Sequence, residues 1–207
     1  MKGQAVTTTE TLKVATDKKR RVGLLGGAFN PIHWGHLLLA EQVLDKLGLD
    51  EVAFMPTYQS PHSEAKPQLA AKHRLKMLEL ALADDDHFLL ETLELERQGT
   101  SYTYETMDIL TTLHPDTAYY FIIGGDMVND LPHWYRIDDL MQLVQFVGAK
   151  RPGYQVQTPY PVMMVDTPQI EISSTAIRQQ VQAGRSIRYQ VPEAVRQYIK
   201  EEGLYLD

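Results

Sequence analysis

Two histidines three positions apart are the first residues of this sequence whose types and spacing could do chemistry. His33 and His36 lie in GGAFNPIHWGH, residues 26–36, which opens with two adjacent glycines. The glycines let a ligand approach the backbone closely, since no Cβ intrudes. A helix that begins near Trp34 would point free N–H groups and the positive end of its dipole at the same place. Together with two imidazole donors, these groups predict a polyphosphate site.

Other interpretations of the histidine pair lack the residues that they need. A zinc site requires at least three protein ligands, and nothing marks a third among candidates such as His62 or Asp126. The stretch contains neither the Gly-x-Gly-x-x-Gly of a dinucleotide site nor the Gly-Lys-Ser/Thr of a Walker A loop. Taken alone, the pair could be surface or core histidines without a chemical role. The pattern favours a phosphate site that uses histidine in place of lysine, and we assign no metal ligands.

A second candidate phosphate-binding segment, ISSTAIR, stands much later in the chain at residues 172–178. Ser173 and Ser174 are favoured N-cap types, and their hydroxyls can donate to a ligand. Arg178 follows about one helical turn further on, so a helix N-terminus, two hydroxyls and a guanidinium would come together. Alone, the segment could be an ordinary capped helix with a solvated arginine. Beside the histidine pair, it predicts a second phosphate clamp.

Both segments resemble signatures of the nucleotidylyltransferase superfamily. GGAFNPIHWGH is similar to the pattern Gly-Gly-x-Phe-Asp/Asn-Pro-x-His-x-Gly-His, and ISSTAIR is similar to Ile-Ser-Ser/Ala-Thr-x-Ile-Arg. The resemblance implies that His33, His36 and Arg178 are catalytic and surround ATP, with Mg²⁺ bridging the phosphates and keeping most of its waters. The implied reaction is in-line attack of a phosphate monoester on the α-phosphorus, which expels pyrophosphate without a covalent enzyme intermediate.

Three further segments are similar to nicotinate mononucleotide adenylyltransferases, which make deamido-NAD from nicotinic acid mononucleotide and ATP. The segments are GTSYTYETMDIL (99–110), FIIGGDMVNDLPHWYRIDDL (121–140) and KRPGY (150–154). By this resemblance the ATP site would include Gly26, Gly27, Ala28, Phe29, Gly124, Asp126, Ile172, Ser173 and Ser174. The mononucleotide site would comprise Thr103, Trp134, Tyr135 and Arg151. Trp134 would stack on the pyridine ring, while the Thr103 segment and the Tyr135 backbone would donate N–H groups to the nicotinate carboxylate. Arg151 would hold the mononucleotide phosphate.

The sequence departs from this family after the second expected strand. The family often has Pro-Asn and then Pro-Pro-His-Lys/Arg, whereas this chain reads MPTYQSPHS. Thr57 therefore replaces the asparagine, and Ser63 stands at the basic position, where Lys66 could substitute. The loop 58–69 is polar and contains prolines, and we expect it to close on substrate.

Two other functions stay open on the sequence alone. A related adenylyl- or cytidylyltransferase, such as the phosphopantetheine or glycerol-phosphate enzyme, would share both motifs, although LPHWY and KRPGY speak against it. A catalytically silent nucleotide sensor would bind NAD-like ligands, although intact His33, His36 and Arg178 speak against that.

Strand and helix patterns alternate from residue 22 onward, which predicts βαβ units and a parallel sheet. With the resemblance, we expect an α/β fold: a doubly wound, mainly parallel sheet of the Rossmann-like nucleotidylyltransferase kind, with C-terminal helices. In such a sheet ligands bind where the winding reverses, so the glycine pairs after VGLL and YYFII should share one crevice. Residues 21–207 are expected to form a single domain after a flexible N-terminal extension, residues 1–20. The expected strands are 22–25, 51–57, 87–96, 118–126, 145–150 and 162–166, and the expected helices are 36–48, 70–84, 102–114, 137–144, 173–184 and 192–203.

The composition limits the partners and the location. The 207 residues carry a formal net charge of −7 with a pI near 5.5, which argues against a general nucleic-acid-binding surface. The absence of cysteine excludes disulfides and cysteine catalysis. No apolar run approaches the roughly 18 residues that cross a bilayer. We expect a cytoplasmic enzyme with two small-molecule substrates and neither nucleic acid nor membrane as partner; a homo-oligomer stays open.

Overall fold

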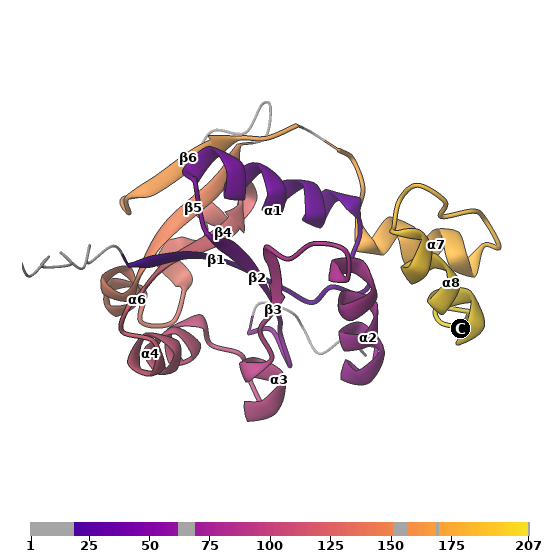
Figure 1. The fold of residues 1–207 in the computed structure, drawn as a ribbon, viewed down its shortest axis with the longest axis horizontal. Coiled ribbons are helices and arrows are strands. Elements are labelled where there is room, and N and C mark those ends of the chain that lie inside the picture. Colours follow the sequence, from indigo (N-terminus) through magenta and orange to yellow (C-terminus); the bar gives the residue numbers. More distant parts are fainter. Residues whose placement is uncertain (1–18, 62–68, 151–156, 169, 207) are drawn as a thin grey trace, which may run out of the picture.

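The computed structural model describes residues 19–61, 69–150, 157–168 and 170–206. These residues form a six-stranded sheet covered by helices (Figure 1). The strands are β1 (Arg20–Gly27), β2 (Glu51–Pro56), β3 (Phe88–Leu90), β4 (Thr117–Gly124), β5 (Val144–Lys150) and β6 (Val162–Asp166). The helices are α1 (Trp34–Leu47), α2 (Ala71–Leu82), α3 (Leu93–Arg97), α4 (Thr103–Leu113), α5 (Gly125–Val128), η1 (Leu131–His133), α6 (Ile137–Leu143), α7 (Ser174–Gln182) and α8 (Glu193–Glu201).

Neighbouring strands of the sheet are all parallel, in the order β3-β2-β1-β4-β5-β6. The chain winds from β1 through β2 to β3, then crosses to the other side of β1 and continues from β4 to β6. In register, Leu25 pairs with Ile122, so β1 and β4 end side by side. The winding reverses between these two strands, where a doubly wound sheet binds its ligands. The predicted fold class is confirmed, including the C-terminal helices.

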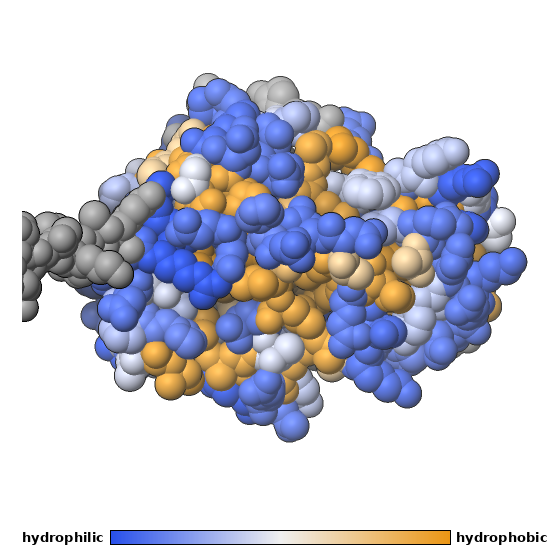
Figure 2. Space-filling view, in the orientation of Figure 1, coloured by the Kyte–Doolittle hydropathy of each residue, from blue (hydrophilic) through white to orange (hydrophobic). Residues whose placement is uncertain are grey.

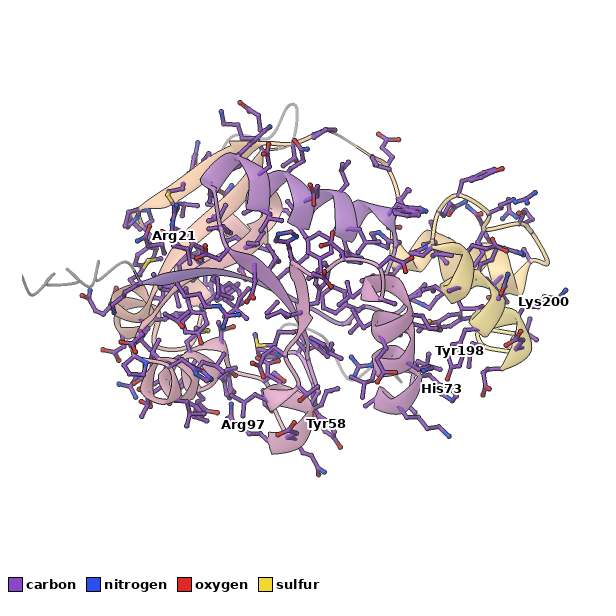
Figure 3. The ribbon with its side chains drawn as sticks, in the orientation of Figure 1. Arg21, Tyr58, His73, Arg97, Tyr198 and Lys200 are labelled. Atoms are coloured by element: carbon purple, nitrogen blue, oxygen red, sulfur yellow. The ribbon has the colours of Figure 1, made fainter. Side chains whose placement is uncertain are left out.

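Helices bury both faces of the sheet, as its nearly continuous apolar strands require. On one face α1, α2, α7 and α8 share a core that includes Leu37, Met77 and Val195. On the other face α4, α5 and α6 cover a second core. Helix α8 also packs on α2, where Nδ1 of His73 lies 2.8 Å from the hydroxyl oxygen of Tyr198 (Figure 3). The C-terminal helices are therefore attached to the face that carries the histidine helix α1.

Helix α1 begins and ends where the sequence predicts. Its first residue is Trp34, and its C-cap Gly48 has a φ of 57° and a ψ of 48°. This left-handed conformation suits a residue without Cβ. The N–H of Gly48 donates to the carbonyl of Asp45 over 3.1 Å, which closes the helix and sends the chain into β2.

The predicted strand over residues 87–96 is wrong in its second half. β3 is only three residues long, and Leu93–Arg97 form helix α3. The alternation in LELE resembles a strand, but leucine, glutamate and arginine are all good helix formers, and the run is too short for periodicity to decide. The short helices α5 and η1 were not predicted. At the N-terminus of the sheet, β1 starts at Arg20, one residue before the expected domain start.

Candidate active site

The carboxyl ends of β1 and β4 open into a cavity of about 470 Å³. Its wall joins the end of β1, the start of α1, the loop after β2, the start of α4 and the segment after β4. The segments after β1 and β4 therefore share one crevice, as the winding predicts. The predicted site residues that line it are Gly26, Gly27, Ala28, His36, Thr103, Gly124, Asp126 and Trp134.

A larger groove, of about 570 Å³, lies between α1, α2 and the start of α8. Hydrophobic side chains such as Leu37, Leu80 and Phe88 line much of it, and Figure 2 shows hydrophobic residues at the surface between α1 and α2. None of the predicted site residues lines this groove. Size alone does not locate the active site, because the smaller cavity at the strand ends is the one that gathers the predicted groups.

The rings of His33 and His36 stack at the start of α1. Their centroids lie 3.7 Å apart with an interplanar angle of 24°, and the backbone N–H of His33 donates to Nδ1 of His36 over 3.3 Å. Because Nδ1 of His36 accepts, the neutral ring is assigned its proton on Nε2, which becomes its donor to a ligand. Gly35 makes room for the stack, since a Cβ there would lie 3.1 Å from the His33 ring.

Burial keeps both imidazoles neutral. It lowers the pKa of His33 to about 4, and burial together with the charge of His33 lowers the pKa of His36 well below its usual value. His33 is 6% exposed, and its Nδ1 has no hydrogen-bond partner among the described residues. Near neutral pH the pair offers N–H donors and not positive charge, so other groups must neutralise a polyphosphate.

Phe29 supports His36 and does not line the cavity, although we expected it in the nucleotide crevice. Its ring is buried and meets the His36 ring edge-on with centroids 5.0 Å apart. On its other side the ring of Phe54 lies 5.7 Å away. The Phe29 backbone has a φ of 46°, a left-handed conformation that is unfavourable for a non-glycine residue. The packing on both sides offsets that strain and places the aromatic ring against the histidine.

Helix α7 binds the histidine loop through side-chain donors. Ser174 Oγ donates to the carbonyl of Pro31, and Arg178 Nη1 donates to the carbonyl of Asn30, each over 2.8 Å. The second nitrogen, Nη2, donates to the hydroxyl of Thr175 over 3.2 Å. A guanidinium has five N–H donors, so Arg178 keeps others for a ligand. The two predicted phosphate-binding segments are therefore in direct contact.

Ile172 and Ser173 bring α7 to the same place. Ser173 is the N-cap, and its side chain accepts from the N–H of Ala176 over 3.2 Å. The carbonyl of Ile172 lies 3.8 Å from the position that a Cβ on Gly35 would take. The start of α7 thus adjoins the start of α1, and their N-termini are next to each other.

Two residues of the site were not found from the sequence. Arg74 is 1% exposed, and it donates to the carbonyl of Ala28 over 2.8 Å and to that of Leu69 over 3.2 Å. The Tyr205 hydroxyl donates to Oδ1 of Asn30 over 2.7 Å. Burial lowers the pKa of Arg74 and raises that of Tyr205. The histidine loop is thus held by α2 and by the segment after α8, as well as by α7.

The side of the cavity expected to bind the mononucleotide is built from aromatic rings. Trp134 lines the cavity, and its ring packs edge-on against Phe121 and Phe146, with centroid distances of 5.9 and 5.8 Å. Tyr135 does not line the cavity; it is 48% exposed and packs on Tyr102 at 4.7 Å. Tryptophan and tyrosine both stand where the chain turns from η1 into α6.

The remaining predicted residues divide between the cavity wall and segments outside the described residues. Thr103 is the first residue of α4 and lines the cavity. Thr57 also lines it, and its N–H donates to the carbonyl of Gly27 over 2.9 Å. Arg151, Ser63 and Lys66 lie outside the described residues, as does most of the loop 58–69.

The described site residues include several donors to anions. Within the described ranges there is no cluster of three or more His, Cys, Asp or Glu side chains that could hold a metal ion. The donors at the site are imidazole, hydroxyl, guanidinium and backbone amide. No helix in the described part of the chain has the length and apolar character to cross a membrane.

A parallel sheet that reverses at a histidine loop, and a serine- and arginine-bearing helix bound to that loop, define a nucleotidylyltransferase. The family model described as "Cytidylyltransferase-like" matches residues 24–180, and the chain belongs to this family. The particular branch follows from the relatives. The chain is 57% identical over 189 residues to "Probable nicotinate-nucleotide adenylyltransferase" of Enterococcus faecalis, with 91% of this chain and 86% of that protein covered.

A second relative agrees with this assignment, and a solved structure shares the fold. The protein of the same name from Lactiplantibacillus plantarum is 56% identical over 202 residues, which cover 98% of this chain and 96% of that protein. The structure of Plasmodium falciparum nicotinic acid mononucleotide adenylyltransferase complexed with NaAD shares the fold, with a TM-score of 0.76 at 19% identity. The match covers 90% of this chain and 97% of the Plasmodium falciparum chain. The chain is a nicotinate-nucleotide adenylyltransferase, which confirms the resemblance seen in the motifs.

Proposed function

We propose that the protein transfers the adenylyl group of ATP to nicotinic acid mononucleotide, giving deamido-NAD and pyrophosphate. The observation that carries this proposal is the convergence of His36, Asp126 and Trp134 on one cavity, beside the contact of α7 with the histidine loop. These residues supply a neutral donor for phosphate, a carboxylate for sugar hydroxyls and a flat face for a pyridine ring. Joining a nucleotide to a pyridine mononucleotide needs all three.

The reaction joins two anions, so catalysis rests on position and charge. An oxygen of the mononucleotide phosphate attacks the α-phosphorus of ATP, the bond from that phosphorus to the oxygen bridging to the β-phosphorus breaks, and pyrophosphate leaves with that oxygen. No side chain forms a covalent bond. Donors fixed in advance at the places where charge develops lower such a barrier without reorganisation.

The histidine loop would hold the α- and β-phosphates. His36 donates from Nε2, and His33 and the N-terminus of α1 lie beside it. The backbone at Gly26, Gly27 and Ala28 borders the same space and would admit the nucleotide closely. Since burial keeps the imidazoles neutral, they would orient the phosphates and leave neutralisation to other groups.

Positive charge would come from Arg178, from the N-termini of α1 and α7, and from Mg²⁺ that enters with ATP as part of the substrate. Ser173, Ser174 and Arg178 would act on the β- and γ-phosphates. The described residues contain no cluster of metal ligands, which suits an ion held by substrate oxygens and water. Gly124 and Asp126 would receive the adenosine portion, and Ile172 would lie against the nucleotide at the start of α7.

The mononucleotide would bind against Trp134, whose ring is already held on two other aromatic rings. Thr103 opens α4, so the free N–H groups of that helix start would face the nicotinate carboxylate. The Tyr135 backbone would add a donor, and Arg151 would hold the phosphate. Backbone donors suit a carboxylate better than a carboxamide, which would favour the acid. We also propose that the enzyme acts in the cytoplasm as a single domain over residues 21–207.

The test is pyrophosphate release with ATP and either nicotinic or nicotinamide mononucleotide, on the wild type and on His36→Ala. We expect turnover with the acid, less with the amide, and a large loss in the variant. Turnover of another phosphate monoester in preference to both would show a different nucleotidylyltransferase. Binding of the substrates without turnover would contradict an enzymatic function and favour a nucleotide sensor.

A further inference from the structure

A buried carboxylate in the cavity wall takes no part in the chemistry described so far. Glu94, on α3, is 2% exposed, yet it lines the same cavity as Thr103 and Trp134. Its Oε1 accepts from the hydroxyl of Thr106 over 3.1 Å. Its Oε2 is buried and has no hydrogen-bond partner among the described residues. A buried carboxylate oxygen without a partner is unfavourable, so a ligand in the cavity is the natural source of the missing bond.

The groups around Glu94 compensate its charge only in part. Burial raises its pKa and Glu91 raises it further, whereas the hydroxyls of Ser101 and Thr106 and the guanidinium of Arg97 lower it. The sum of these effects leaves the pKa above its ordinary value. The charged form of Glu94 is therefore less favourable here than in water.

The compensating groups are also shared with other partners. Arg97 donates to Thr106 Oγ1 over 3.1 Å and to Glu105 over 2.5 Å, and Ser101 Oγ accepts from the N–H of Tyr58 over 3.0 Å. Figure 3 labels Arg97 and Tyr58 beside α3. Among the described residues, no group of this network makes a hydrogen bond to Oε2. Among the described residues that line the same cavity, the other titratable groups are His36 and Asp126.

The acid and amide mononucleotides differ in what they can offer Oε2. A nicotinate carboxylate only accepts hydrogen bonds, so it can pair with Glu94 only when Oε2 carries a proton. A carboxamide can donate through its NH₂ group and so can pair with the ionised form. A bound nicotinate also adds a second negative charge, which disfavours ionisation of a neighbouring carboxyl.

We propose that Glu94 is a specificity-determining residue, which binds the nicotinate carboxylate by donating a hydrogen bond from protonated Oε2. Ionisation of Glu94 then weakens the preference for the acid over the amide. Where free Glu94 is ionised, binding of the acid takes up one proton, and product release returns it to solvent. The proposal rests on the proposed function, because it takes the pyridine ring to lie in the cavity that Glu94 and Trp134 share.

The test measures kcat/KM for nicotinic and for nicotinamide mononucleotide between about pH 6 and pH 9, where catalytic groups of this kind titrate. The ratio of the two constants is the readout, because titration of the shared phosphate cancels from it. We expect the wild-type ratio of acid to amide to fall about tenfold or more as the pH rises, the size of one charged hydrogen bond. In Glu94→Gln, whose amide donates at every pH, the ratio should not fall. Glu96→Gln, which removes a charge from the exposed side of the same helix, should behave as the wild type.

A second variant changes the surroundings of Glu94 without replacing its carboxyl group. Thr106→Val removes the donor to Oε1, so it should move the midpoint of the wild-type curve to higher pH. A flat wild-type ratio, an unchanged slope in Glu94→Gln or an unmoved midpoint in Thr106→Val overturns the proposal. If thermal unfolding shows that Glu94→Gln does not fold, the wild-type and Thr106→Val curves decide. Absence of turnover with either mononucleotide would contradict the proposed function instead.

Discussion

On the phosphate side of the cavity, side-chain donors hold backbone carbonyls, whereas on the pyridine side aromatic rings rest on one another. Three donors, from Arg74, Ser174 and Arg178, reach the carbonyls of residues 28, 31 and 30 at distances of 2.8 Å. The Trp134 ring instead meets two other rings edge-on. Hydrogen bonds fix distance and direction, while ring contacts fix little more than a surface. The difference places rigid geometry where charge must be neutralised and a less directional surface where a flat ring must bind.

Removal of the central donor should give the largest effect. His36→Ala takes away the N–H that the His33 backbone orients, so we expect kcat to fall about 10²–10³-fold, which is about 2.7–4 kcal/mol of barrier. The KM for the mononucleotide should change little, because that substrate binds on the other side. Steady-state kinetics with both substrates varied measure this. His114→Ala, at an exposed histidine outside the cavity, is the control, and a similar loss there would contradict the assignment.

Lowering the pH should reduce the free energy of unfolding through His33, which lies on the phosphate side of the cavity. Its pKa is about 4 in the folded protein against 6.5 as a free group, so unfolded chains bind a proton first as the pH falls. The contribution of His33 to the free energy of unfolding is therefore complete above pH 6.5 and is lost as the pH falls from 6.5 towards 4. The loss should be at most about 3 kcal/mol. Urea unfolding across this range should show a smaller pH dependence in His33→Asn, and equal slopes would refute the assignment.

Loss of the aromatic surface should appear in binding and not in the chemical step. Trp134→Ala should raise the KM for nicotinic acid mononucleotide about tenfold, or about 1.4 kcal/mol, because the pyridine ring loses its flat partner. The KM for ATP should stay nearly unchanged. Trp134→Phe keeps an aromatic face and should recover most of the affinity. A fall in kcat without a change in KM would show that Trp134 acts in the chemical step. The pyridine and phosphate sides of the cavity would then not be functionally separate.

The smallest effect tests the outer support of the histidine loop. Tyr205→Phe removes one hydrogen bond, to Asn30, and should lower the free energy of unfolding by about 1 kcal/mol. Chemical denaturation is the measurement, and Tyr189→Phe, at a residue 81% exposed, is the matched control. Equal stability of the two variants would show that this contact does not stabilise the loop.

What the sequence could predict follows from how local each signal is. The histidine loop and the α7 segment each carry several fixed residue types within a few positions. The sequence alone therefore predicts a phosphate-binding role for both. Arg74 was not, because its importance depends on burial against a distant loop. One signal existed: it stands on the same stripe of α2 as the buried Met77 and Leu78. Glu94 could not be recognised for a related reason: LELE alternates like a strand, and only the fold buries this carboxylate and brings it to Thr106 on α4.

The contacts that hold the histidine loop differ in how well their two partners should tolerate substitution. The donors are particular side chains, but most of the acceptors are main-chain carbonyls, which every amino acid supplies. For these bonds, a substitution at Ala28 keeps the main-chain carbonyl to which Arg74 donates, whereas a substitution at Arg74 removes the donor from that carbonyl. A saturation scan read out as stability should therefore find the less replaceable partner of each of these bonds in α2 or α7, and not at the loop residue whose carbonyl accepts.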